Sequence, residues 1–383
     1  MKFTVLTTLA LLAASIAASA NVTFTGVDGR DRTFDELAAI QGDADTNRQC
    51  QQQNGGYIPT LKAGQYAASK FHNCFHTSAQ IYEFVDALAS QNPKLLTKVA
   101  ISTTYQGKTI YGYKLSKGAR SQSLYFQAMQ HAREWVAGSS LLFSLSSILD
   151  DIANNRATIA DTFDVYFVPI VNIDGYEITW SNNRYQRKSA NEVDLNRNWP
   201  TPNKNPNPPS KSDETYPGPN PFSEPETKGI DAFIKSKSSE IAGFVDLHTY
   251  AGLILYAYGD TKQPIGNGYD QKFDALGQGM KKVMGAYTPQ HAYQLYLAYG
   301  VFPDYAFRQF KKPAITIEIT GNDFTAPAST IRTRGTEIYK GLTQFAKEVV
   351  TFNGKNIVVD EDVIDAGAAV EGGEEILAEP IVD

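Results

Sequence analysis

The chain has 383 residues, 42% of them hydrophobic, and a formal net charge of −6. A chain of this length can form one large domain with a well-filled core. Its basic residues are scattered and much of its acidity lies in the C-terminal tail, so charge gives no sign of a nucleic-acid-binding surface.

The N-terminus resembles a secretory signal. Met1 and Lys2 form a basic start, residues 5–17 are apolar, and the small residues 18–20 suit a cleavage site. A membrane-spanning helix needs about 20 apolar residues, and this run is shorter. We therefore expect residues 1–20 to be a signal peptide and the protein to be secreted and extracellular, with no membrane association.

Residues 21–70 are polar and read as an N-terminal extension rather than a separate domain. Cys50 and Cys74 are the only cysteines. In an oxidising compartment they most simply form one disulfide, which stabilises the fold by about 3 kcal/mol in the chain-entropy model. Two buried free thiols are the alternative. Residues 353–383 combine Gly, Ala and many acids with no aromatic, which predicts a disordered acidic tail.

The first predicted helix begins after Thr77, which can form a capping box with Gln80, and ends before Pro93. Its apolar stripe consists of Ile81, Phe84, Val85 and Leu88. Further helices are expected at 136–152, 224–235, 269–284 and 330–350. Strands are expected at 99–103, 110–115, 123–129, 165–171, 241–247, 253–258 and 314–319.

This alternation predicts a single α/β domain with a central mixed, twisted sheet of about eight strands and helices on both faces. Ligands of such sheets bind outside the strand ends. His131 follows one predicted strand and His248 ends another, so both suit that position. The segment 202–225, rich in Pro, Asn and Ser, is expected to be a long irregular loop near the mouth of the site.

His131 and Glu134 lie three residues apart directly after the apolar run 124–129. Imidazole nitrogen and carboxylate oxygen are zinc ligands, and a catalytic zinc site needs three protein ligands with one open position. His248 is the best third candidate among five histidines. Each signal alone has an ordinary alternative: a solvent-exposed His and Glu pair, or a histidine of the core.

The surrounding motifs strengthen the metal interpretation. They are His131-Ala132-Arg133-Glu134-Trp135, Asn183-Arg184-Tyr185-Gln186-Arg187-Lys188, Asp194-Leu195-Asn196-Arg197-Asn198-Trp199 and His248-Thr249-Tyr250, followed by Tyr296, Asp304 and Glu318. In this order they resemble the zinc carboxypeptidases of the pancreatic A and B type over roughly residues 71–352. The resemblance implies a metallocarboxypeptidase-like catalytic domain over 71–352 that binds one Zn²⁺ ion and acts on peptide or protein C-termini.

The resemblance also implies roles for individual residues. Glu318 matches the general base that takes a proton from the attacking water and passes it to the leaving amine. A Glu in an apolar strand could instead pair with a buried Arg or point outward from an edge strand. The other implied roles are Arg187 facing the carbonyl oxygen, Asn196 and Arg197 holding the α-carboxylate, Tyr296 closing over it, Arg133 and Arg184 lining the approach, and Asp194 orienting the His131 ring.

The resemblance also implies that six residues surround the side chain of the last substrate residue: Leu255, Gly259, His291, Leu295, Pro303 and Thr316. None is acidic, so a basic C-terminal residue is disfavoured and a large apolar or aromatic one is expected. His291 departs from the apolar residues of A-type members.

Two other functions share part of this pattern. A zinc amidohydrolase that cleaves acyl groups from amino acids needs His131, Glu134 and His248 but not the α-carboxylate residues. A secreted binding protein descended from the enzyme is expected to lack a ligand or the base, and neither is missing. Family members of the A and B type usually carry an activation segment larger than residues 21–70, so activation by its removal is not expected here. We expect a monomer.

Overall fold

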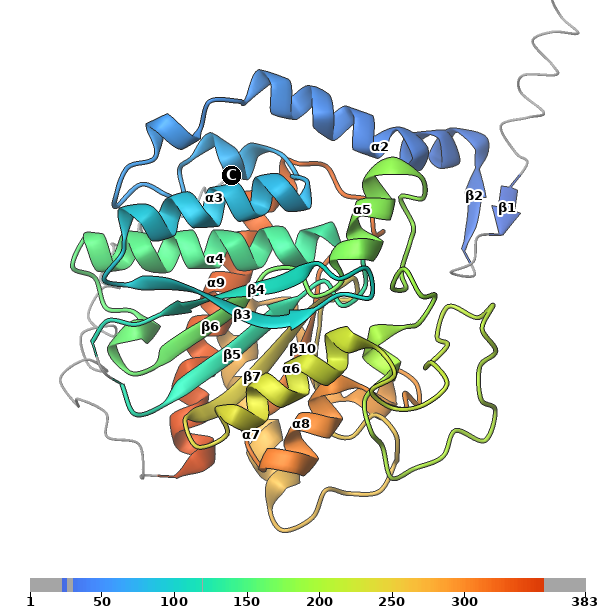
Figure 1. The fold of residues 1–383 in the computed structure, drawn as a ribbon. Helices are drawn as coiled ribbons and strands as arrows, with labels where there is room; N and C mark the ends of the chain where they lie inside the picture. The colour runs from blue at the N-terminus through green and yellow to red at the C-terminus, as the bar shows by residue number, and fades with distance from the viewer. Residues whose placement is uncertain (1–22, 26–29, 119, 355–383) are drawn as a thin grey trace, which may run out of the picture.

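A computed structural model describes residues 23–25, 30–118 and 120–354 of the chain (Figure 1). The predicted signal peptide, and the predicted acidic tail from residue 355 onward, lie outside the described residues.

The centre of the domain is an eight-stranded sheet with the order β3-β4-β6-β5-β7-β10-β8-β9. Its strands are β3 Leu96–Thr103, β4 Thr109–Leu115, β5 Ser123–Ala128, β6 Asp164–Val168, β7 Ile241–Thr249, β8 Leu253–Tyr256, β9 Thr288–His291 and β10 Ala314–Ile319. The four middle strands β6, β5, β7 and β10 run parallel to one another. The antiparallel pairs are β3 with β4, β4 with β6, and β8 with β10. The predicted mixed sheet of about eight strands is confirmed.

The described residues also form one hairpin, five short 3-10 helices and eight α-helices. The hairpin joins β1 Thr23–Thr25 to β2 Asp31–Thr33. The α-helices are α2 Phe34–Gln53, α3 Ser78–Gln91, α4 Trp135–Ala153, α5 Ile173–Ser181, α6 Pro225–Ser236, α7 Tyr269–Met284, α8 Phe302–Phe310 and α9 Thr330–Asn353. The 3-10 helices are η1 Ile58–Thr60, η2 Lys70–Asn73, η3 Ile159–Asp161, η4 Leu195–Arg197 and η5 Ala292–Gln294. The capping box of Thr77 and Gln80 forms as predicted.

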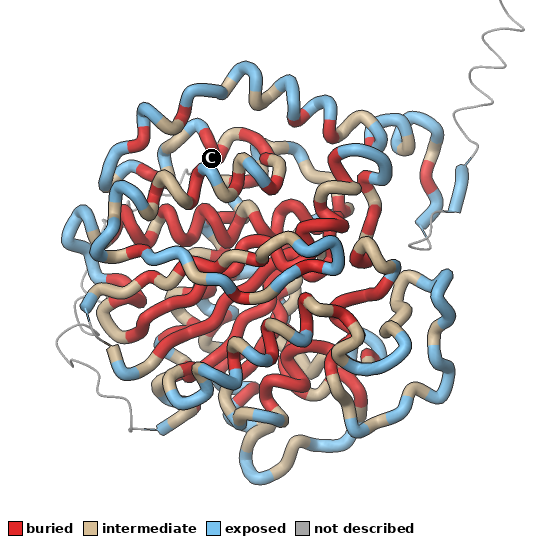
Figure 2. Tube along the Cα trace, viewed as in Figure 1, coloured by how far each residue is buried: buried red, intermediate tan, exposed pale blue. Residues whose placement is uncertain are grey.

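Successive residues of β5 show how the sheet is covered on both faces, because side chains alternate along a strand. The Tyr125 ring contacts Phe233 of α6 and Phe302 of α8. The next residue, Phe126, contacts Phe345 of α9 on the opposite face. The sheet is therefore buried on both sides, as the red interior of Figure 2 shows.

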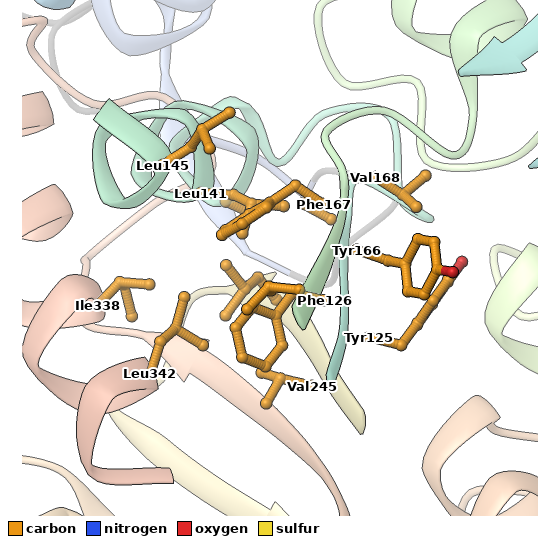
Figure 3. Packing of buried hydrophobic residues seen from close by; sticks show 14 of the residues in the cluster. Tyr125, Phe126, Leu141, Leu145, Tyr166, Phe167, Val168, Val245, Ile338 and Leu342 are labelled. Atoms are coloured by element: carbon orange, nitrogen blue, oxygen red, sulfur yellow. The ribbon is translucent and has the colours of Figure 1, made fainter. Parts of the chain in front are cut away.

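The face that carries Phe126 packs against α4 and α9. Figure 3 shows Leu141 and Leu145 of α4, and Ile338 and Leu342 of α9, gathered over Phe126. The helix α4 is long and apolar enough to cross a membrane, but 83% of its most apolar window is buried inside the domain. We therefore read α4 as a core helix.

The described part of the N-terminal extension contains the 20-residue helix α2, which runs over the outside of the domain (Figure 1). Cys50, near its end, forms the predicted disulfide with Cys74. Because α2 is largely exposed and polar, its apolar pattern is too weak to predict a helix.

His76 provides a test of the packing beneath this extension. Its ring is buried, stacks on Phe71 with 4.2 Å between ring centroids, and places Nε2 2.8 Å from the Phe71 carbonyl oxygen. Burial lowers its pKa to about 4, whereas an unfolded histidine titrates near 6.5. The unfolded chain therefore binds the proton first as the pH falls, and stability is lost between about pH 6.5 and pH 4.

Lowering the pH from 7 to 4.5 reduces the free energy of unfolding of the wild type. We predict that this reduction is about 2 kcal/mol smaller in His76→Gln. Urea unfolding at both pH values measures this difference, with His291→Gln as the control. An identical pH dependence in His76→Gln and the wild type would contradict the assignment.

Candidate metal centre and active site

Three buried side chains from distant parts of the chain bring ligand atoms together at the end of the sheet. Nδ1 of His131 lies 2.8 Å from Oε1 of Glu134, and Nδ1 of His248 lies 2.9 Å from Oε2 of the same carboxylate. The two Nδ1 atoms are 3.0 Å apart. Ligands at about 2.0–2.2 Å from a tetrahedral zinc ion lie about 3.3 Å from one another. The group is therefore close to the spacing that one zinc ion requires.

The other nitrogen of each ring shows that these atoms suit a cation. Nε2 of His131 lies 3.1 Å from Asp194, and Nε2 of His248 lies 2.8 Å from Asp246. When each Nε2–H donates to its carboxylate, both Nδ1 atoms present lone pairs to each other and to Glu134. The two lone pairs and the Glu134 carboxylate repel one another unless a cation lies between them. The three residues therefore fit a single zinc ion.

Protonation is the alternative way to neutralise this group. Burial alone lowers the pKa of His248, but the nearby Asp246 and Glu134 carboxylates raise it well above its ordinary value. Burial likewise raises the pKa of Glu134, but the two histidines lower it more. A proton between His248 and Glu134 thus competes with the metal, and affinity for the metal falls as the pH falls.

The fold brings these residues together through the carboxyl ends of two adjacent parallel strands. His131 follows β5 by three residues, and Glu134 is the N-cap residue of α4. His248 is the penultimate residue of β7, which pairs with β5. The backbone N–H of Thr249 donates to Glu134 at 3.2 Å and fixes the carboxylate between the strands. The predicted position outside the strand ends is confirmed.

Glu318 lies beside the metal ligands because β10 pairs in parallel with β7. In this register Glu318 is opposite His248. Its side chain is partly buried and lines the same pocket as His131. Burial raises its pKa to about 7, with Glu134 adding to the shift and His248 and Arg187 opposing it. A carboxyl group that titrates near neutral pH is suited to accept and release a proton during catalysis.

The predicted α-carboxylate residues Asn196, Arg197 and Tyr296 line the same pocket. Arg197 donates to the Asn196 carbonyl oxygen at 2.7 Å and to the Tyr296 hydroxyl at 3.0 Å. The side chain of Asn196 lies 3.3 Å from Nε2 of His248 and accepts from the Phe302 N–H at 2.9 Å. Tyr296 is half exposed at 52%. Among the described residues Arg197 forms no ion pair, so its charge is available to an anionic ligand.

Asp194 connects the metal centre to Arg187. One carboxylate oxygen faces His131, and the other accepts from Nε and a terminal nitrogen of Arg187 at 3.0 and 2.8 Å. Burial raises the pKa of Asp194, but Arg187 and His131 lower it well below its usual range. Asp194 therefore stays ionised and holds both the His131 ring and the Arg187 guanidinium in place.

The structure places Arg133 and Arg184 away from the pocket. Arg133 pairs with Glu214 at 2.7 Å, and its guanidinium lies 4.0 Å from the centroid of the Phe324 ring. Arg184 is buried and forms an ion pair with Asp43 at 2.6 Å. The sequence predicted that both would line the approach to the site, but the described contacts show Arg184 enclosed by protein.

The pocket beside Glu318 and Arg197 has a volume of about 510 Å³ including its open mouth. Four of the six residues predicted for specificity line it: Leu255, Leu295, Pro303 and Thr316. Five further residues line it that were not expected there: Tyr256, Ala292, Ala298, Val301 and Asp304. Its wall is therefore mostly apolar.

Gly259 and His291 do not reach the pocket surface. The Gly259 N–H donates to Asp304 at 2.7 Å, and a Cβ at this position would lie 3.3 Å from Ala292. His291 does not line the pocket; its Nδ1 lies 2.6 Å from the Ala257 carbonyl oxygen and its Nε2 lies 3.7 Å from Asp270. The prediction that Gly259 and His291 line the specificity pocket is therefore corrected.

Sequence reasoning missed two carboxylates of the site. Asp246 lies two residues before His248 in an otherwise apolar strand, and this spacing places both side chains on one face of the sheet. The expectation of a pocket without an acidic residue is wrong, because Asp304 lines it. Its carboxylate is turned towards the N–H groups of Gly259 and Asp260. Burial, together with Asp260, raises its pKa to about 7.

This site is that of a metal-dependent hydrolase, and comparisons with known proteins identify the family. A zinc carboxypeptidase family model matches residues 81–341. Human carboxypeptidase A1 is 32% identical over 292 residues, covering 70% of this chain and 68% of the relative. Mouse carboxypeptidase A2 is 30% identical over 301 residues, covering 72% and 70%. The carboxypeptidase A structure from Helicoverpa armigera superposes with a TM-score of 0.69 at 22% identity, covering 84% and 82%, and supports the fold.

The chain belongs to the zinc carboxypeptidase family. It is a metallocarboxypeptidase, a zinc-dependent hydrolase that acts on peptide C-termini.

We predict that Asp246→Asn weakens zinc binding at least about 10-fold, because loss of a carboxylate behind a metal-binding histidine typically has this effect. Competition with a chromogenic chelator measures the affinity. Asp274→Asn, on α7, serves as the control. Unchanged affinity in Asp246→Asn would show that Asp246 does not orient His248.

Proposed function

We propose that the enzyme is a secreted exopeptidase that releases one large apolar or aromatic residue at a time from peptide C-termini. The observation that carries this proposal is a mostly apolar pocket lined by both Glu318 and Arg197, whose guanidinium forms no ion pair among the described residues. An apolar C-terminal residue bears both a side chain for the wall and a carboxylate for Arg197.

Arg197 and Asn196 bind the substrate's α-carboxylate in this proposal. A guanidinium can donate two parallel hydrogen bonds to a carboxylate, which gives strength and direction. Tyr296 already accepts from Arg197, and its exposed ring is free to close over a bound terminus. This requirement for a free carboxylate restricts cleavage to the last peptide bond.

Glu318 moves the proton of the reaction. It takes a proton from the attacking water and donates it to the nitrogen of the leaving residue. Arg187, held by Asp194, faces the developing negative charge on the carbonyl oxygen; loss of one such donor typically costs about 3 kcal/mol. When bound by His131, Glu134 and His248, zinc lowers the pKa of water and polarises the carbonyl group.

Secretion is supported by the sequence of residues 1–20 and by the disulfide between Cys50 and Cys74, since disulfides persist in oxidising compartments. We propose that the protein acts as a monomer and without a membrane.

The requirement for a free C-terminus tests the proposed reaction. We predict that a peptide with a free C-terminal Phe is cleaved at least about 100-fold faster, in kcat/KM, than its C-terminal amide, a difference of about 2.7 kcal/mol. Arg197→Ala lowers kcat/KM for the free acid and therefore reduces the ratio of free acid to amide. A chelator abolishes cleavage of both peptides. A wild-type enzyme indifferent to the amide would not be a carboxypeptidase, and the amidohydrolase alternative would gain support.

A panel of acyl dipeptides tests the predicted specificity. We expect C-terminal Phe and Leu to be preferred over Lys and Arg. Because Asp304 titrates near pH 7, its carboxyl group is neutral below this pH and anionic above it. The preference for Phe over Lys should therefore be greatest at pH 6 and decrease several-fold at pH 8.

Asp304→Asn serves as the control and should show a constant preference over this pH range. Fastest turnover of substrates ending in Lys or Arg would overturn the apolar assignment.

A further inference from the structure

Helix α2 of the N-terminal extension contacts the catalytic domain through a buried ion pair. Asp43 accepts from Nε of Arg184 at 2.6 Å, and the exposed fractions of the two side chains are 13% and 3%. These residues are 141 positions apart in the sequence. The pair therefore links the extension to the segment that follows α5.

The remaining donors of Arg184 are directed at the active-site region. One terminal nitrogen donates to the Arg133 carbonyl oxygen at 2.9 Å, and the other donates to the Phe324 carbonyl oxygen at 3.1 Å. The guanidinium also lies 3.7 Å from the centroid of the Trp135 ring. Arg184 thus binds α2, the residue before Glu134 and the loop after β10 at the same time.

Both carbonyl groups belong to segments that shape the site. Arg133 precedes the metal ligand Glu134, so its peptide orientation sets where that carboxylate points. The Phe324 ring lies 4.9 Å from that of Tyr250, which is two residues after His248. We call Phe324 and Tyr250 the aromatic wall; neither ring lines the pocket for the last residue.

Helix α2 is held firmly at its other end. Besides the disulfide of Cys50, Gln51 donates to the Phe75 carbonyl oxygen at 2.6 Å, and Asn47 accepts from the Phe75 N–H at 3.2 Å. Near Asp43, by contrast, a crevice lies between α2 and residues 179–185, and Arg184 lines it. The ion pair, together with the hydrogen bond from Arg48 to the Trp180 carbonyl oxygen, therefore fixes α2 across this crevice.

We propose that Asp43 is a positioning residue of the active site. It acts through Arg184 on the backbone at Arg133, next to the metal ligand Glu134, and on the aromatic wall. The N-terminal extension is in this view a permanent part of the substrate groove. The inference rests on the proposed function, because the aromatic wall would contact substrate residues that precede the cleaved bond.

Loss of the Asp43 charge leaves a buried guanidinium without its carboxylate, which is strongly unfavourable. Burial already lowers the pKa of Arg184 in the presence of Asp43. The guanidinium then gains hydration by turning into the crevice, and it releases the carbonyl groups of Arg133 and Phe324. The backbone at Arg133 and the aromatic wall then lose their hydrogen bonds to Arg184 together.

The test compares Asp43→Asn with Asp45→Asn. Asp45 lies on the same helix, and its ion pair with Arg48 is solvent exposed. For Asp43→Asn we expect the Kd for zinc, measured by chelator competition, to rise about 10-fold. We also expect the ratio of KM for a pentapeptide to KM for an acyl dipeptide to rise about fivefold, equivalent to about 1 kcal/mol. Asp45→Asn and the conservative Asp43→Glu should retain both values.

A purely structural role gives a different result. In that case Asp43→Asn lowers the Tm but leaves the Kd for zinc and the KM ratio unchanged, which would overturn the proposal. If Asp43→Asn fails to fold, Arg184→Lys keeps the charge while losing the branched geometry, and the same two measurements decide. Zinc-loaded wild-type protein that does not cleave either peptide would refute the proposed function, independently of Asp43.

Discussion

The structure depends on one electrostatic constraint, the convergence of two imidazole nitrogens and a carboxylate within 3.0 Å in a buried position. Asp194 and Asp246 accept from the opposite ring nitrogens, so the lone pairs of both histidines point inward. A bound metal ion, or a proton that competes with it, makes this arrangement favourable. The fold therefore preorganises a zinc site, and the carboxylates behind the histidines are as necessary to it as the ligands.

The same constraint explains the rest of the site. Asp194 contacts both His131 and Arg187, so the metal centre and the Arg187 guanidinium are positioned together. The parallel pairing of β7 and β10 places Glu318 opposite His248 without any loop to vary the distance. Strand register thus fixes Glu318 beside the metal ligands, whereas Tyr296 lies on an exposed segment.

Much of this could be predicted from the sequence. Strong periodic patterns gave α7 and β10 with their observed bounds, and the ordered motifs identified His131 and His248. Features that depend on tertiary contact could not be predicted. The polar strand β9 lacks alternation, α2 lacks an apolar stripe, and Asp304 lies in the pocket because helix α8 turns it there. The burial of Arg184 likewise depends on Asp43, a residue distant in sequence.

The most direct test is a crystal structure of the zinc-loaded enzyme with anomalous data collected at the zinc edge. The account predicts a single strong peak about 2.0–2.2 Å from Nδ1 of His131, Nδ1 of His248 and the Glu134 carboxylate, with Glu318 beside it but not bound. No peak at this position, or a zinc ion bound elsewhere on the chain, would contradict it.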